Sequence, residues 1–194
     1  MIRETKHGLA NVGNFNGRDA RQTFWFYVLF LVLVQFAVGL LIAIPAMVSA
    51  VGTTMDAAQA GADPEAVQAQ MMAEMGAQMG SMMWLSIGLS VLMTVLFVAA
   101  FVRRLHDGGF TGWIAVIPVA IQAFAVYYSI EQTAQMQEIF TSGVDLVEMQ
   151  RMQAEITSNP LNYLSYLGYL VVIGFGIIKS QDGPNQYGEK PQAI

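Results

Sequence analysis

Four stretches of this chain contain no charged residue and approach or exceed the length that a lipid bilayer requires. They are residues 24–50, 82–102, 112–130 and 161–178. A transmembrane helix needs roughly 20 apolar residues to cross a hydrocarbon layer of about 30 Å. The sequence therefore predicts an all-α integral membrane fold with four transmembrane helices.

The overall composition agrees with a membrane protein. Only 12% of the 194 residues are charged, 55% are hydrophobic and the mean hydropathy is +0.47, whereas about 25% of an ordinary soluble domain is charged. Residues 1–23 are polar and the first span is long, which argues against a cleaved signal peptide. We expect one membrane domain over residues 1–194, with outer helical segments at 51–81 and 131–160 and a cytoplasmic tail at 179–194.

The distribution of basic residues predicts the orientation of the spans. All but one of the nine Lys and Arg residues precede the first span, join the second to the third, or follow the fourth, and the exception is Arg151. The positive-inside rule places such segments in the cytoplasm. We therefore expect both termini inside the cell, with acidic helical extensions on the outer face.

Two local signals predict where the outer helices begin and end. Residues 63–65 read Asp-Pro-Glu, which supplies an N-cap, a proline in the first turn and an acid near the positive end of the helix dipole. This helix should run from Pro64 to Val102, through the second span. A further helix should begin near Val144 and stop before Asn159 and Pro160.

Methionines gather at the start of the second long helix, at helical spacings: Met71, Met72, Met75, Met79, Met82 and Met83. Thioethers in this pattern can bind a soft ion such as Cu(I), or they can form a flexible apolar face that packs against another helix. The chain has no cysteine, which excludes disulfides and thiolate ligands. We expect neither a metal site nor a cofactor.

The predicted spans contain no Asp, Glu, Lys, Arg or His. Proton relays and ion-coupled pumps normally require such residues within the membrane, so a proton-driven transporter is disfavoured. Gln35 and Gln122 are polar exceptions and lie near the middle of the first and third spans. Their amides either form an interhelical hydrogen bond, which contributes about 1 kcal/mol to helix association, or line a pathway for a solute.

The most distinctive motif links the second span to the third and reads RRLHDGGFTGW over residues 103–113. Basic side chains at the end of a helix suit its dipole. Gly109 can adopt the left-handed conformation that ends a helix, and Thr111 can cap the next one. Asp107 can neutralise a basic neighbour. The motif predicts a tight helical hairpin.

Three sequence blocks resemble the bacterial inner-membrane family known as domain of unknown function 805. The first is Phe15-Asn16-Gly17-Arg18 followed by Arg21, Phe24 and Trp25; the second is the 103–113 motif; the third is Gly183-Pro184-Asn185-Gln186-Tyr187-Gly188, ending at Pro191. The resemblance implies a multi-pass protein of the bacterial inner (plasma) membrane with no assigned activity. The chain departs from the family at Asp19, where a small residue is usual, and in its longer outer segments.

The predicted topology brings several basic residues to the cytoplasmic interface: Arg18, Arg21, Arg103, Arg104, His106 and Lys179. One hypothesis is that they bind an anionic headgroup or a phosphate-bearing ligand. The alternative is a structural motif in which an Arg–Asp107 pair locks the hairpin and the tail forms the floor of the bundle. The structural residues would be Asp107, Gly109, Thr111, Trp113, Asn185 and Tyr187.

Three classes of function fit these features. The favoured class is a non-enzymatic membrane component that binds anionic lipid or a partner protein through its basic face. The second is a small transporter or channel that acts as a homo-oligomer. The third is a membrane enzyme with His106 and Asp107 as an acid–base pair, although neither a nucleophile nor a metal set accompanies them, and we assign no catalytic residue. We expect the lipid bilayer as a partner and no nucleic acid.

Overall fold

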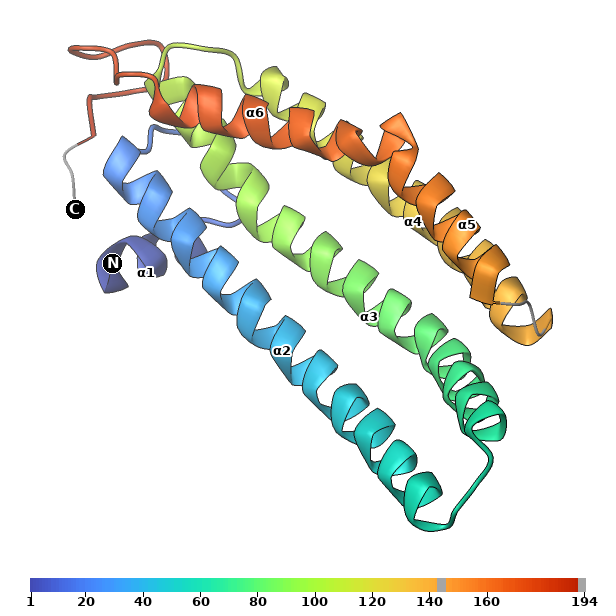
Figure 1. Cartoon of the computed structure of the whole chain (residues 1–194). Coiled ribbons are helices and arrows are strands. Elements are labelled where there is room, and N and C mark those ends of the chain that lie inside the picture. Colours follow the sequence, from blue (N-terminus) through green and yellow to red (C-terminus); the bar gives the residue numbers. More distant parts are fainter. Residues whose placement is uncertain (143–145, 192–194) are drawn as a thin grey trace. The chain divides into compact units, whose positions relative to one another are not determined.

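The computed structural model describes residues 1–142 and 146–191, and over these residues the chain forms helices and no strands. The helices are α1 (Ile2–Ala10), α2 (Arg21–Gln59), α3 (Pro64–Asp107), η1 (Gly112–Ala115), α4 (Val116–Ser142), α5 (Leu146–Ser158), η2 (Pro160–Tyr163) and α6 (Leu164–Ile177) (Figure 1). The η elements are single turns of 3₁₀-helix that lead into α4 and α6.

Four helical segments are long and apolar enough to cross a membrane: Arg21–Ala57, Gly76–Asp107, Gly112–Gln137 and Pro160–Ile177. The prediction of an all-α fold with four membrane-spanning helices is confirmed. The placement of both termini inside the cell stays a prediction.

Local signals set the boundaries of the longest helix. The backbone N–H of Glu65 donates to the Asp63 carboxylate over 3.2 Å, so α3 begins at Pro64 as the sequence predicts. It ends at Asp107, one turn beyond the predicted Val102. Helix α5 ends at Ser158, whereas its predicted start near Val144 lies outside the described residues.

The chain divides into two compact units. Unit 1 comprises Met1–Gln35, Leu89–Ala125 and Tyr163–Ile194, and unit 2 comprises Phe36–Gly88 and Val126–Asn162. Unit 1 therefore contains all three sequence motifs and the segments that precede α2 and follow α6.

The core of unit 1 is built from aromatic side chains of α2 and α3. Phe24 and Phe101 are fully buried, and Phe97 stacks on Phe101 with ring centroids 5.4 Å apart. Helix α6 packs closely on this core, because a Cβ atom added at Gly176 would lie 2.7 Å from the Trp25 ring. Trp25 also donates its ring N–H to the Gly176 carbonyl over 3.1 Å. These contacts place the end of α6 beside the start of α2.

Helix α1 docks on α2 through a glycine. A side chain at Gly8 would collide with the ring of Tyr27. That ring is buried and held in place, since the Tyr27 hydroxyl donates to the Leu96 carbonyl over 3.0 Å. His7 in the same turn lies 2.9 Å from the Asp19 carboxylate. The segment before α2 is thus part of the folded core.

Unit 2 joins the far ends of α2 and α3. Thr53 donates to Glu74 over 3.1 Å, and Thr54 contacts the Met71 sulfur at 3.4 Å. Met47, Met71, Met79 and Met82 line an apolar groove of about 330 Å³ in this unit. The predicted methionine residues Met72 and Met75 have side chains outside the described part of the structure.

Candidate functional site

The carboxyl-terminal end of α3 is buried although it is strongly polar. Three arginines and two aspartates meet there and are at most 8% exposed; we call them the arginine–aspartate cluster: Arg18, Asp19, Arg103, Arg104 and Asp107. Burying ions is expensive unless they are paired and hydrogen-bonded. The chain meets this requirement with contacts from the segment before α2, from the end of α6 and from the tail.

Asp107 is the centre of the cluster. One carboxylate oxygen accepts from Nε and Nη2 of Arg18, over 3.2 and 3.1 Å. The other accepts from Arg104 and from the Ser180 hydroxyl. The Asp107 carbonyl also accepts from the backbone N–H of Gln181 over 2.9 Å. Asp107 therefore ties the segment before α2, the end of α3 and the tail to one another.

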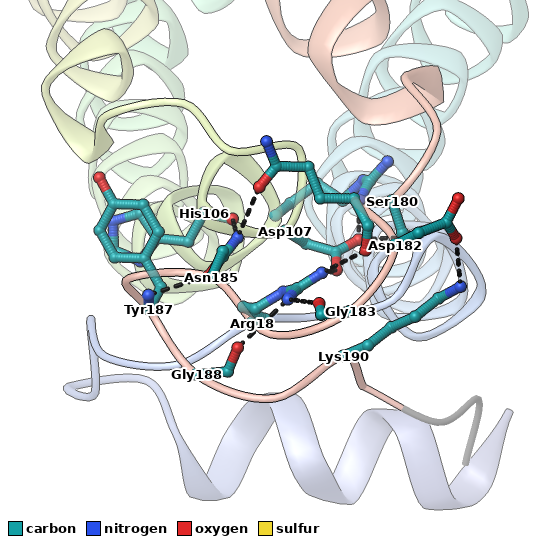
Figure 2. Close-up of polar contacts among 12 residues, drawn as sticks. Arg18, His106, Asp107, Ser180, Asp182, Gly183, Asn185, Tyr187, Gly188 and Lys190 are labelled. Carbon is teal, nitrogen blue, oxygen red and sulfur yellow. Dashed lines mark hydrogen bonds and ion pairs between the residues drawn. The ribbon is translucent and has the colours of Figure 1, made fainter.

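All five N–H donors of Arg18 have acceptors within the chain (Figure 2). Besides Asp107, its guanidinium donates to the carbonyls of Gln181, Gly183 and Gly188, over 2.8, 2.8 and 3.2 Å. The tail can present these carbonyls because Gly183 and Gly188 adopt positive φ angles of 75° and 128°. Glycine tolerates such angles at no steric cost. Arg18 therefore holds the folded tail in place through these hydrogen bonds.

Arg104 caps the end of α6. Its guanidinium donates to the Gly176 carbonyl over 3.1 Å and also to the Ile178 carbonyl. The last carbonyls of a helix have no partner within the helix and carry the negative end of its dipole. A cation there satisfies both, while Asp107 neutralises its charge.

Arg103 binds the segment before α2. Its Nε donates to Asp19 over 2.9 Å, and Nη1 donates to the carbonyls of Asn11 and Asn14. The backbone closes the same contact, since Asp19 donates its N–H to the Arg103 carbonyl over 3.1 Å. Within the described residues, Arg103 Nη2 is buried without an acceptor. Two of the three nitrogens of Arg103 are therefore engaged by this segment.

His106 faces the tail. Its ring stacks on Tyr187 (Figure 2), with centroids 3.7 Å apart and planes within 3°. The Nδ1 atom of His106 lies 3.2 Å from the Gly17 carbonyl. Asn185 donates to the His106 carbonyl over 2.9 Å and accepts from the backbone N–H of Tyr187. Among the described residues, His106 and Asp107 share no side-chain hydrogen bond. The His106 ring contacts Tyr187 and Gly17, whereas the Asp107 carboxylate contacts the arginines.

The hairpin between α3 and η1 has the local geometry that its sequence favours. Gly109 has a φ angle of 82° and ends α3. The Thr111 hydroxyl accepts from the backbone N–H of Trp113 over 3.4 Å at the start of η1. The Trp113 ring is 80% exposed, which suits a side chain at the surface of a bilayer.

The remaining two basic residues named from the sequence lie on the surface. Arg21 is exposed in the first turn of α2. Lys179 is also exposed and forms an ion pair of 3.2 Å with Asp182, which Lys190 approaches to 2.8 Å. Hydrogen bonds from Lys190 and Lys179 hold the pKa of the Asp182 carboxyl below its usual value. The six residues thus separate into four buried and two exposed.

Sequence reasoning missed Asp19 and Ser180 as members of the site. Asp19 follows Arg18 directly and is the only acidic residue between Glu4 and Asp56. This isolated acid was the one sign in the sequence that a distant arginine could have a buried partner here. Ser180 left no signal, because its role depends on how the tail folds.

Comparison with known proteins identifies one matching family. A family described as "Protein of unknown function (DUF805)" matches residues 12–189. The matched range contains the whole arginine–aspartate cluster and the tail residues that contact it. No curated protein and no solved structure matches the chain. The chain therefore belongs to the DUF805 family, whose function is unknown.

Proposed function

We propose that the protein is a non-enzymatic component of the bacterial inner membrane that binds the headgroup of an anionic phospholipid at its basic, cytoplasmic end. The observation that carries the proposal is the contrast between Arg21 and the other arginines of the three motifs. Arg18, Arg103 and Arg104 donate to the chain itself, whereas no hydrogen bond or ion pair from the described residues reaches the exposed Arg21.

The surroundings of Arg21 suit a phospholipid. An open groove of about 530 Å³ runs beside it and is lined by Trp25, Phe26, Leu29 and Ile177. These side chains are apolar, and Leu29 and Ile177 are 44% and 58% exposed. A lipid bound here would place its phosphate at the guanidinium and an acyl chain along the groove.

The local field also favours an anion. The first turn of α2 contains no acidic residue, so the positive end of its dipole is uncompensated by its own side chains. Exposed Arg3 and Lys6 add positive charge to the same unit. The positive-inside rule assigns such an end to the cytoplasmic leaflet, where anionic lipids create a negative surface potential.

Lipid retention by an Arg21→Gln variant tests the proposal. The full chain is reconstituted in nanodiscs of phosphatidylglycerol and phosphatidylcholine, and native mass spectrometry counts the lipids that remain bound on release. A hydrogen bond to a charged group contributes about 1.5–3 kcal/mol, so we expect the variant to bind phosphatidylglycerol roughly tenfold or more weakly.

Arg3→Gln is the matched control, because it removes the same exposed charge from α1 without touching the groove. It should retain phosphatidylglycerol as the parent chain does. Equal retention by the parent and the Arg21→Gln variant, or equal losses in both variants, would contradict a headgroup site at Arg21. Copurification of a second protein that only Arg21→Gln abolishes would assign the same surface to a protein partner.

A further inference from the structure

Unit 1 also contains a cavity between its four spans. It has a volume of about 350 Å³ and is lined by residues of α2, α3, α4 and α6. Most of its wall is apolar and includes Met93, Phe97 and Val119. Small-molecule pockets in proteins range from about 300 to 1,000 Å³ and combine apolar walls with a few polar groups. The cavity fits this description in size and lining.

Two amides are among the polar groups of the lining, which also includes hydroxyl side chains. Gln35 of α2 and Gln122 of α4 both line the cavity. No hydrogen bond joins them or reaches either amide from the described residues, so they do not form the interhelical contact that the sequence allows. The Thr94 hydroxyl in the same wall is satisfied by the Ser90 carbonyl over 2.8 Å. Polar groups left unpaired at membrane depth cost several kcal/mol each. Gln35 is exposed and Gln122 is half-buried, so a ligand in the cavity can reach and satisfy both amides.

The lining restricts what that partner can be. It contains no Asp, Glu, Lys, Arg or His, and an unpaired charge inside a bilayer is strongly disfavoured. A charged ligand is thus excluded. An amide N–H₂ group offers two donors, which carbonyl oxygens can accept. The apolar wall requires the rest of the ligand to be soluble in lipid.

We infer that this cavity binds a neutral, lipid-soluble molecule whose carbonyl oxygens accept hydrogen bonds from Gln35 and Gln122. Both a quinone and an ester-linked neutral lipid such as a diacylglycerol carry this chemistry. The site differs in its chemistry from the proposed headgroup site, which requires an anion and Arg21, although Trp25 borders both. The test of this cavity depends on the two glutamines, and the test of the headgroup site depends on Arg21. Either site can therefore fail its test without affecting the other.

Fluorescence of Trp25 provides the test, because its ring lines the cavity. The chain has three tryptophans, so Trp84→Phe and Trp113→Phe leave Trp25 as the only reporter. Decylbenzoquinone, which quenches tryptophan, is titrated into this protein in detergent. We expect saturable quenching, and about tenfold weaker binding when Gln35→Leu and Gln122→Leu remove both amides, as two hydrogen bonds of about 0.5–1.5 kcal/mol imply.

Control variants separate the amides from general effects. Gln186→Leu makes the same change on the exposed tail and should bind as the parent does. Val119→Phe fills part of the cavity without touching an amide and should also weaken binding. Equal unfolding of all variants in sodium dodecyl sulfate shows that the fold is kept. Unchanged quenching in Val119→Phe, or in the double glutamine variant, would overturn the inference.

Competition identifies the source of the ligand. Dioctanoylglycerol that reverses the quenching indicates an ester lipid, whereas quenching that it leaves unchanged, but that still depends on both glutamines, indicates a quinone. Decylbenzene has the same chain and no carbonyl, so it should compete poorly. Equal competition by decylbenzene would overturn the inference, since the cavity would then select only for apolar volume.

Discussion

At the scale of single residues, the main requirement is to balance the charges that are buried at the end of α3. Three buried arginines face only two buried aspartates, Asp19 and Asp107, so the carboxylates alone do not balance the charge. Backbone carbonyls supply the remainder, above all those at the end of α6, which carry the negative end of a helix dipole. Such a cluster is stable only while every part of it is in place.

The first prediction concerns Asp107. An Asp107→Asn substitution leaves Arg18 and Arg104 buried without their shared anion, and removing one member of a buried pair costs about 3–5 kcal/mol. Unfolding by sodium dodecyl sulfate in mixed micelles should show a loss of this size in the free energy of unfolding.

Asp182→Asn is the control for this prediction, because it also removes an aspartate that is ion-paired but lies on the surface. Exposed pairs contribute roughly 0–1 kcal/mol, so little change is expected. If both variants unfold alike, the cluster does not stabilise the fold as described.

At the scale of helices, contacts that are local in sequence could be predicted, and contacts between distant segments could not. Asp63 and Thr111 cap the helices that follow them, and Gly109 ends α3, because each acts on neighbouring backbone. The pairing of Asp19 with Arg103 spans 84 positions. No local pattern records such a distance. The sequence therefore identified the basic residues but left open whether they bind a ligand or pair with acidic residues of the chain itself.

Helix α1 gives a prediction at this scale. The Gly8→Val side chain would collide with the buried Tyr27 ring and should displace α1 from α2. Trypsin should then cleave after Lys6 several-fold faster than in the parent chain. Gly13→Val adds the same side chain where no atom lies within 4 Å and should leave the rate unchanged. Equal rates in all three proteins would show that α1 is not held by this contact.

At the scale of the whole molecule, charge is divided between segments that the spans separate. The segment up to the first residue of α2, the last turns of α3, and the segment after α6 hold all but one of the nine basic residues. The turn from α2 to α3 contains Asp63 and no basic residue. The proposed orientation follows from this division, and both proposed lipid-binding sites depend on the chain crossing a bilayer.

Thiol labelling tests this topology most directly, because the chain contains no cysteine and a single introduced one is its only thiol. Ala62→Cys lies in the exposed turn between α2 and α3, and Gln186→Cys lies in the exposed tail. In intact bacterial cells, a membrane-impermeant maleimide should label Ala62→Cys at once and Gln186→Cys only after lysis. Labelling of Gln186→Cys in intact cells, or equal labelling of the two positions, would contradict four crossings with both ends inside.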